Sequence, residues 1–259
     1  MAASAKAHEG EPRAGVQSVE RALGVLALYR HGPAELGISE IARQTGLNLS
    51  TAHRMVKALC NEHFMEQDPD NERYRLGAAL LALGQRALDH SGFATALPRL
   101  GQLAEQTGES ATLGIRRGND VIVVLTAASQ QRLRFDHAAG AGIGLHASAM
   151  GKALLAFGGM SATAAVAELP ALEKYTASTI TSRAGLAADL ETAVAAGYAV
   201  NREERYEGVC GVAAPVLRHG GRAVAAVGLQ GPTARLESRG FATLGDDVRA
   251  TADDIARLI

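Results

Sequence analysis

The chain has 259 residues, which is enough for one large domain or two small ones. Its formal net charge is −1, so it is not a polycation, and only modest non-specific attraction to polyanions is expected. Hydrophobic residues make up 47% of the chain but aromatic residues only 4%, which predicts a core built from Ala, Leu and Val.

The N-terminal stretch MAASAKAHEGEPRAG lacks the apolar core of a signal peptide, and residues 1–14 are expected to form a disordered tail. No apolar stretch approaches the roughly 20 residues that span a bilayer, so no membrane contact is expected. The only cysteines, Cys60 and Cys210, are too few for a disulfide framework. These features fit a protein of the reducing cytoplasm.

Three helices are predicted between residues 17 and 61. The segment QSVERALGVLALY forms the first, which is expected to pack behind the other two. Its predicted inward face consists of Val19, Ala22, Leu23 and Leu26. The segment ISEIARQTG forms the second helix, which Ser39 can cap and which Gly46 can end in a left-handed conformation. Its apolar face consists of Ile38, Ile41 and Ala42.

The third helix, within NLSTAHRMVKALCN, has the pattern of a DNA-reading helix. Asn48 or Ser50 can cap its start. Apolar residues at helical spacing face inward, namely Ala52, Met55, Val56 and Leu59. Short polar and basic side chains remain on the other face, namely Thr51, His53, Arg54 and Lys57. Such a face suits base edges and phosphates in a major groove, although two ordinary core helices would show the same amphipathic pattern.

The flanking segments favour the DNA-binding interpretation. FMEQ and RYRL are strand-like and are joined by DPDNE, whose Asp, Pro and Asn form turns. Three helices and a hairpin make a winged helix-turn-helix, predicted for residues 15–76. Against this, residues 13–76 carry eight basic residues (Lys plus Arg) and eight acidic residues (Asp plus Glu). The basic side chains must therefore gather on one face if the domain binds DNA.

Arg54 is the first candidate for a base contact, because Arg with guanine is the commonest specific pairing. Ser50, Thr51 and His53 are supporting candidates, and other basic residues are expected to contact phosphates. The complete set of candidate DNA-binding residues is Arg21, Ser39, Ser50, Thr51, His53, Arg54, Lys57, Arg73 and Arg75.

Residues 77–91, which include GAALLALGQRALDH, predict a linker helix. One apolar stripe consists of Ala79, Leu80, Leu83 and Ala87. A second consists of Leu81 and Leu88. A helix that is apolar on two sides needs two partners, so we expect it to contact the DNA-binding domain and a second copy of itself. A plain buried helix is the alternative.

The residue pattern changes at about residue 92, and residues 92–259 predict a second domain. A helix is followed by two strands with a Gly-Asn turn, and LRFDHA is a possible third strand. Helices begin at AMGKALLAFG and near Gly185. Three further strands, two of them joined at HGG, precede a last helix. This order predicts an α+β fold in which helices flank an antiparallel sheet.

The sequence offers no enzymatic site. A phosphate loop would need Gly and Ser or Thr where His146 and Ala153 stand, and no Ser has a nucleophile-elbow context. The histidines show no metal-ligand spacing. The charge run from Arg202 to Arg205 is interpreted as a solvated surface. We therefore expect no catalytic residues, no metal and no cofactor.

Three segments resemble IclR-type bacterial transcriptional regulators, from about Gln17 to the C-terminus. They are SVERALGVL with LGISEIARQTGLNLSTAHRMVKAL, then LHASAMGKALLAF, then GYAVNREERYEGVCGVAAPV with GRAVAAVGLQGP. The resemblance implies a regulator, expected to be a repressor, that binds double-stranded operator DNA as a dimer or dimer of dimers. It also implies a GAF/profilin-like C-terminal domain that binds a small organic effector. A sensor with degenerate DNA recognition is the alternative.

By this resemblance, the effector would lie against the sheet beneath residues 146–150. The implied effector-binding residues are Leu133, Phe135, His146, Ala149, Met150, Asn201, Gly211, Gly228 and Gln230. Three positions differ from the pattern of glyoxylate-type members. Those members resemble a pattern with Cys or Ser at the position of Gly211, and with Ser at the positions of Gly228 and Gln230. We therefore expect a larger, less charged pocket, lined in part by Leu133, Phe135 and Met150, and an aromatic or amide-like effector. Cys210 should point to the other face.

Overall fold

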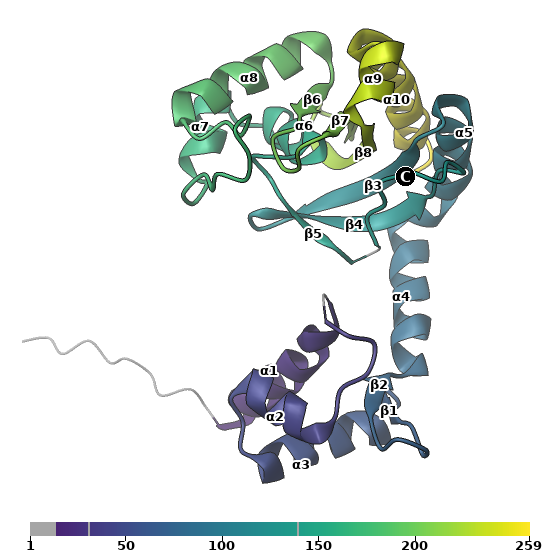
Figure 1. Ribbon diagram of the computed structural model, residues 1–259, viewed down its shortest axis with the longest axis vertical. Coiled ribbons are helices and arrows are strands. Elements are labelled where there is room, and N and C mark those ends of the chain that lie inside the picture. Colours follow the sequence, from purple (N-terminus) through teal and green to yellow (C-terminus); the bar gives the residue numbers. More distant parts are fainter. Residues whose placement is uncertain (1–13, 31, 139) are drawn as a thin grey trace, which may run out of the picture. The chain divides into compact units, whose positions relative to one another are not determined.

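The computed structural model describes residues 14–30, 32–138 and 140–259. The chain forms two compact units, and the boundary between Ala87 and Leu88 falls within helix α4 (Ala78–Ser91) (Figure 1). The tail predicted for residues 1–14 lies outside the described residues, apart from Ala14, which begins helix α1.

The first unit is a winged helix-turn-helix, as the sequence predicts. Its helices are α1 (Ala14–Ala27), the 3₁₀ turn η1 (Leu28–Arg30), α2 (Ile38–Thr45) and α3 (Leu49–Asn61). The wing is an antiparallel hairpin of β1 (Met65–Gln67) and β2 (Tyr74–Leu76). Its buried core consists of Val25, Leu36, Ile41, Val56, Met65 and Tyr74.

Local capping sets the turn between α2 and α3. Gly46 ends α2 with φ at +68°, in the left-handed region that favours glycine. Asn48 caps α3, because its Oδ1 accepts the backbone N–H of Thr51 at 2.8 Å. The predicted cap at Ser39 is wrong: Gly37 holds the N-cap position, and Ser39 lies inside the first turn of α2.

Helix α1 buries only part of the predicted face, since Leu26 packs against the core and Ala22 is half-buried. Val19 and Leu23 are 59% and 60% exposed, whereas Val25 is fully buried. The helix has apolar residues on two faces, and helical periodicity does not decide which of them packs against α2 and α3. The packing therefore leaves an apolar stripe of α1 in contact with solvent.

The second unit is built on a six-stranded antiparallel sheet with the order β5-β4-β3-β8-β7-β6. The strands are β3 (Ser110–Arg117), β4 (Asp120–Ala127), β5 (Gly142–Gly144), β6 (Ala199–Arg202), β7 (Val209–Leu217) and β8 (Ala223–Pro232). The Gly-Asn turn between β3 and β4 and the HGG turn between β7 and β8 are both confirmed.

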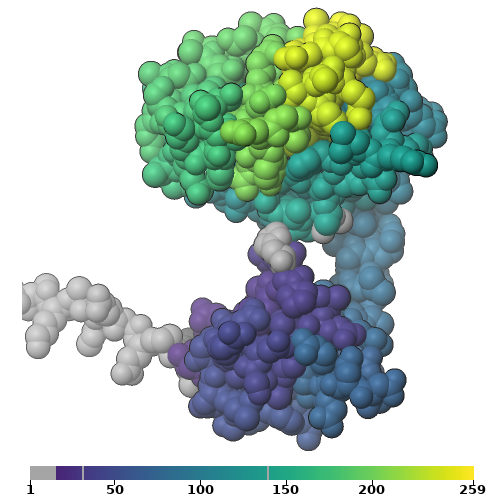
Figure 2. Space-filling view, in the orientation of Figure 1, coloured from purple at the N-terminus to yellow at the C-terminus, as the bar shows by residue number. Residues whose placement is uncertain are grey.

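Helices cover both faces of this sheet. The short η2 (Phe93–Ala96) leads into α5 (Leu97–Thr107), which packs with α9 (Thr233–Arg239) and α10 (Phe241–Ala256) on one face. On the other face pack α6 (Ala149–Ala156), α7 (Ala162–Ala167) and α8 (Arg183–Ala196). In Figure 2, the α7–α8 region in green and the C-terminal helices in yellow form one continuous surface of this unit. The predicted α+β fold is confirmed.

The third strand predicted at LRFDHA is wrong. Residues 128–138 contain no strand, and β5 pairs with β4 in its place. The carboxylate of Asp136 accepts hydrogen bonds from Ser110 at 2.5 Å and from Arg134 at 2.6 Å. These two bonds fix Asp136 to Ser110 of β3 and to Arg134, in a segment that forms no strand.

Helix α4 has no buried residue. Leu81 and Leu83 are 78% and 53% exposed, so its predicted apolar stripes are present but largely uncovered in the single chain. Within residues 14–30, 32–138 and 140–259, none of the helices combines the length and the apolar character needed to cross a bilayer.

Candidate DNA-reading surface and effector pocket

Helix α3 presents the predicted polar face to solvent. Ala52 and Val56 are buried, whereas His53, Arg54 and Lys57 are exposed. Within the described part of the chain, no carboxylate forms an ion pair with Arg54 or Lys57. Both cations are therefore available to an anionic partner.

Four other predicted contact residues lie at the start of α3, on α1 and on α2. Ser50 is exposed and donates its hydroxyl to Asn48 Oδ1 at 3.0 Å, so it supports the cap. Thr51 is half-buried at the edge of the polar face, and Arg21 is exposed on α1. Ser39 is also exposed, on α2.

The arginines of the wing are already paired. Arg73 lies 2.7 Å from the Glu40 carboxylate and also donates to the backbone carbonyl of Glu35. Arg75 lies 3.5 Å from Glu66. The backbone N–H of Gly37 and the charge of Arg73 hold the pKa of Glu40 below its usual range. The sequence-based expectation that both arginines are free for phosphates did not include these acidic neighbours.

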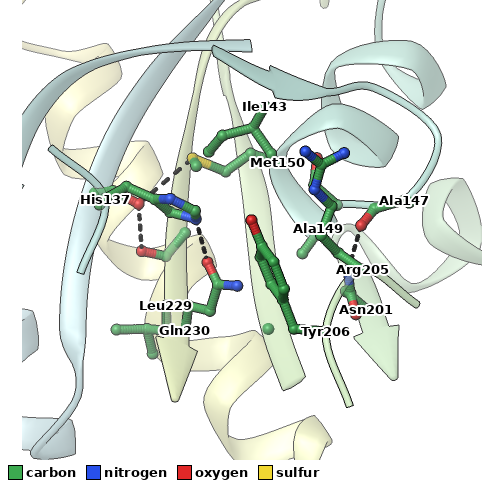
Figure 3. Close-up of a pocket in the computed structure, with 14 residues that line it drawn as sticks. His137, Ile143, Ala147, Ala149, Met150, Asn201, Arg205, Tyr206, Leu229 and Gln230 are labelled. Atoms are coloured by element: carbon green, nitrogen blue, oxygen red, sulfur yellow. Dashed lines mark hydrogen bonds between the residues drawn. The ribbon is translucent and has the colours of Figure 1, made fainter. Parts of the chain in front are cut away.

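A pocket lies on the α6 side of the sheet in the second unit, and its own side chains nearly fill it, because its cavity volume is only about 20 Å³. Six predicted residues line it, namely Ala149, Met150, Asn201, Gly211, Gly228 and Gln230. Figure 3 shows the ring of Tyr206 standing in the middle of this group, between Gln230 and Asn201. Cys210 is buried on the opposite face of the sheet, as predicted.

Arg205 places a positive charge at the pocket. Its guanidinium lies 4.2 Å from the ring centre of Tyr175 and 5.7 Å from that of Tyr206. Burial disfavours its charged form, but hydrogen bonding to Tyr206 and the nearness of Tyr175 outweigh this, and the pKa of Arg205 is raised. No carboxylate of the described residues forms an ion pair with it.

His137 lies across the pocket and is held by Gln230. Its Nε2 is 2.5 Å from Gln230 Oε1, and because that amide oxygen can only accept, the imidazole donates. Burial lowers the pKa of His137, and the bond to Gln230 offsets this only in part. A neutral imidazole with its proton on Nε2 follows.

Comparisons with known proteins identify the family. Residues 18–69 match the IclR helix-turn-helix domain, and residues 85–257 match the bacterial transcriptional regulator IclR C-terminal domain. The chain belongs to the IclR family of bacterial transcriptional regulators. It is 39% identical over 226 residues to the glycerol operon regulatory protein of Streptomyces griseus, which covers 85% of this chain and 87% of that protein.

Solved IclR structures have the same fold. An IclR transcriptional regulator from Alicyclobacillus acidocaldarius matches 93% of this chain and 98% of its own, with a TM-score of 0.83 and 28% identity. An IclR homologue from Microbacterium hydrocarbonoxydans, solved with 4-hydroxybenzoate, covers the same shares with a TM-score of 0.81 and 23% identity. Family members of this kind are transcriptional regulators rather than enzymes, as the sequence predicts.

The glycines of this IclR-family pocket do not enlarge it. A Cβ on Gly228, which lines the pocket, would lie 2.7 Å from Met150 Cγ. A Cβ on Gly211 would meet Ala149 at 3.6 Å. The space that the small residues leave is thus filled by helix α6, so these glycines do not open the pocket in the way that the sequence-based expectation assumed.

Arg205 lines the pocket, so a cation is present where the sequence-based expectation placed little charge. Glu204, the residue before it, is only 4% exposed and its carboxylate lies 2.6 Å from the ammonium of Lys152. Two residues of the run interpreted as a solvated surface thus point inward. The aromatic Tyr206 next to this run is the sequence feature that could have indicated a pocket.

Three predicted effector-binding residues lie outside the pocket lining. Leu133 is 70% exposed in the irregular connection after β4. His146 is buried, and its Nε2 lies 2.9 Å from the carbonyl oxygen of Glu173, so its ring packs against the backbone instead of lining the pocket. Phe135 lies behind the pocket, with its ring centre 5.2 Å from that of Tyr206. Further lining residues that the sequence-based analysis missed are Thr112, His137, Ile143, Ala147, Ser148, Arg205, Tyr206 and Leu229.

Proposed function

We propose that this IclR-family regulator is a repressor that reads its operator with helix α3 of two copies. The unpaired cations Arg54 and Lys57 on the exposed face of α3 carry this proposal. Arg54 is assigned to a base, with Ser50, Thr51 and His53 as neighbouring contacts. Lys57 and Arg21 are assigned to phosphates. A protein bound at an operator excludes other proteins from that DNA, which is the basis of repression.

The experiment is fluorescence anisotropy on the DNA directly upstream of the protein's own gene, against a scrambled duplex, at two salt concentrations. Preferential binding to the upstream DNA is expected, and Arg54→Ala should weaken it by about 1–3 kcal/mol and relax specificity at one position. A uniform loss on both duplexes would reassign Arg54 to a phosphate. Equal weak binding of the unmodified protein to both would favour a sensor with degenerate DNA recognition.

The pocket is proposed as the effector site, and the effector as a small aromatic compound with an anionic group. Arg205, a guanidinium without a carboxylate partner among the described residues, supports the anionic group. The ring of Tyr206, which lines the pocket, supports an aromatic body. A carboxylate is therefore preferred to the neutral amide that the sequence also left open. The similarly folded homologue solved with 4-hydroxybenzoate agrees with this class.

Calorimetry with 4-hydroxybenzoate, 4-hydroxybenzamide and glyoxylate tests the effector class. Arg205→Met should weaken binding of 4-hydroxybenzoate by about 1.5–3 kcal/mol, roughly 10- to 100-fold, because a charged hydrogen bond is lost. Arg202→Met is the matched control, since that guanidinium stacks on Phe241, 4.0 Å from the ring centre, and does not line the pocket. Tight binding of glyoxylate with no binding of the aromatic acids would overturn the proposal.

Self-association is proposed through helix α4. Its leucines Leu81 and Leu83 are 78% and 53% exposed, and none of its residues is buried. Leu81 and Leu83 belong to the two different apolar stripes of this helix, and an apolar stripe in water is stabilised when a partner covers it. A second copy of the same helix is the partner we propose, and it would also bring a second α3 to the DNA.

A further inference from the structure

Lys152 is a fully buried lysine next to the pocket. It lies in α6 with 0% of its surface exposed, and its Nζ is 2.6 Å from Glu204 Oε1 and 2.9 Å from Asp189 Oδ2. Glu204 is 4% exposed, whereas the side chain of Asp189, on α8, is 34% exposed. One ammonium is therefore shared by two carboxylates, one buried and one in contact with solvent.

This ion cluster joins the two elements that form the pocket. Lys152 follows Met150 by two residues in the same helix, and Met150 fills the base of the pocket. Glu204 directly precedes Arg205 and Tyr206, which line it. In Figure 3, Tyr206 and Arg205 project into the space next to Met150 and Ala149. The Lys152–Glu204 contact therefore ties residues 203–206 to the first turn of α6.

Two features of residues 203–206 raise the free energy of the observed conformation. Glu203 has φ at +58°, in the left-handed region that is unfavourable for a residue with a side chain. The second carboxylate oxygen of Glu204, Oε2, is buried and finds no hydrogen-bond partner among the residues that the structure describes. A buried unpaired carboxylate oxygen is expensive in free energy, and moving into water would relieve it.

We propose that Lys152 and Glu204 are positioning residues that latch residues 203–206 over the effector pocket, with Asp189 as the second acceptor that allows release. This inference rests on the proposed effector role of the pocket. When the segment moves outward, the hydrogen bonds from the hydroxyls of Thr176 and Thr179 to the carbonyls of Glu203 and Glu204, each 2.7 Å, also break. Glu204 then becomes hydrated and Lys152 stays paired with Asp189. The ammonium is then never left buried without a counter-charge, which would be the largest penalty for opening.

Removing the charge of Glu204 and removing the charge of Asp189 must then have opposite effects on the release of residues 203–206. Removing the charge of Glu204 breaks the latch and favours the released segment. Removing the charge of Asp189 withdraws the alternative partner, so the ammonium depends on Glu204 and the latch tightens. A merely structural ion cluster would show no such opposition, because loss of either carboxylate would loosen it.

A single tryptophan can report on the segment, because the chain contains no Trp. In a Tyr206→Trp background, acrylamide quenching of fluorescence measures how freely solvent reaches this position. Tyr206 is 42% exposed, so the parent is already partly quenched; we expect Glu204→Gln to raise the quenching constant above the parent value and Asp189→Asn to leave it at or below that value. Glu109→Gln is the matched control, since Glu109 is 2% exposed, is held by Arg235 at 2.5 Å, and lies outside the pocket lining. It should leave quenching unchanged.

Two results would overturn the latch. One is equal quenching in the Glu204→Gln and Glu109→Gln variants, and the other is a rise in quenching for Asp189→Asn. Urea unfolding of each variant guards against a general loss of fold, because Glu204→Gln and Glu109→Gln both remove a buried carboxylate charge. The quenching measurement needs no ligand. A failure of 4-hydroxybenzoate to bind would therefore count against the proposed effector class without altering the result for the latch.

Discussion

Met150 occupies the space that a side chain on Gly228 would need. A Cβ built on Gly228 would lie 2.7 Å from Met150 Cγ, closer than real Cβ contacts come. Because β8 lacks a side chain at this point, α6 can pack its methionine directly onto the strand. The glycine thus controls how closely the helix approaches the sheet, and the methionine controls how much of the pocket remains open.

Gly228→Ala should therefore destabilise the second unit by about 1–3 kcal/mol through overpacking. Met150→Ala should destabilise it by about 2–5 kcal/mol, because a buried side chain is removed. In the double variant, the methyl group introduced at position 228 partly fills the space left by the Met150 side chain. The double variant should therefore lose less unfolding free energy than the sum of the losses in the two single variants. Urea unfolding followed by circular dichroism measures all three. Strict additivity would show that Met150 does not fill the glycine's space.

Arg73→Ala should leave the salt dependence of operator binding almost unchanged. Arg73 is 2.7 Å from Glu40, so its charge is already balanced within the domain. Lys57→Ala serves as the comparison, since the exposed Lys57 has no ion pair among the described residues. A cation that neutralises a phosphate contributes about one unit to the slope of log K against log salt. A drop of that size for Arg73→Ala would return Arg73 to the phosphate contacts.

Stability of the second unit should fall as the pH is lowered through the range in which histidine titrates. Burial lowers the pKa of folded His137 below its ordinary value of 6.5. Below that value the unfolded chain binds a proton that the folded chain does not, so the free energy of unfolding decreases with falling pH. One such group contributes a slope of up to about 1.4 kcal/mol per pH unit.

Unfolding free energies measured between about pH 7.5 and pH 5.5 check this dependence. His137→Gln, which cannot be protonated in this range, should remove part of the slope. An unchanged slope in His137→Gln would mean that the pH dependence arises from other groups.

Leu81→Glu should weaken self-association without lowering the stability of the single chain. Leu81 is 78% exposed, so a charge there meets only water unless a second copy covers it. Light scattering over a range of protein concentrations measures the change in assembly. Ala82→Glu places the same charge on a neighbouring exposed position of α4 that is about 100° away around the helix, and it should have a smaller effect. Equal assembly in both variants and the parent would remove α4 from the interface.

Features governed by neighbours in the chain could be predicted from the sequence. The turn of the DNA-binding domain depends on Gly46 and Asn48, whose roles follow from backbone conformation and one capping hydrogen bond. The hairpin turns and the alternation that sends Cys210 and Gly211 to opposite faces are equally local. For the same reason the winged helix-turn-helix and the antiparallel sheet were both predictable.

The chemistry of the pocket depended on residues that are distant in sequence. In the sequence, Glu204 and Arg205 look like part of a solvated charge run. In the structure, Lys152 pairs with Glu204, and the rings of Tyr175 and Tyr206 lie against Arg205. Whether Gly228 opens a cavity depended on Met150, which is 78 residues earlier in the chain. Periodicity and spacing determine what a residue offers to its own helix or strand. Burial, charge pairing and free volume are decided only when another element packs against it.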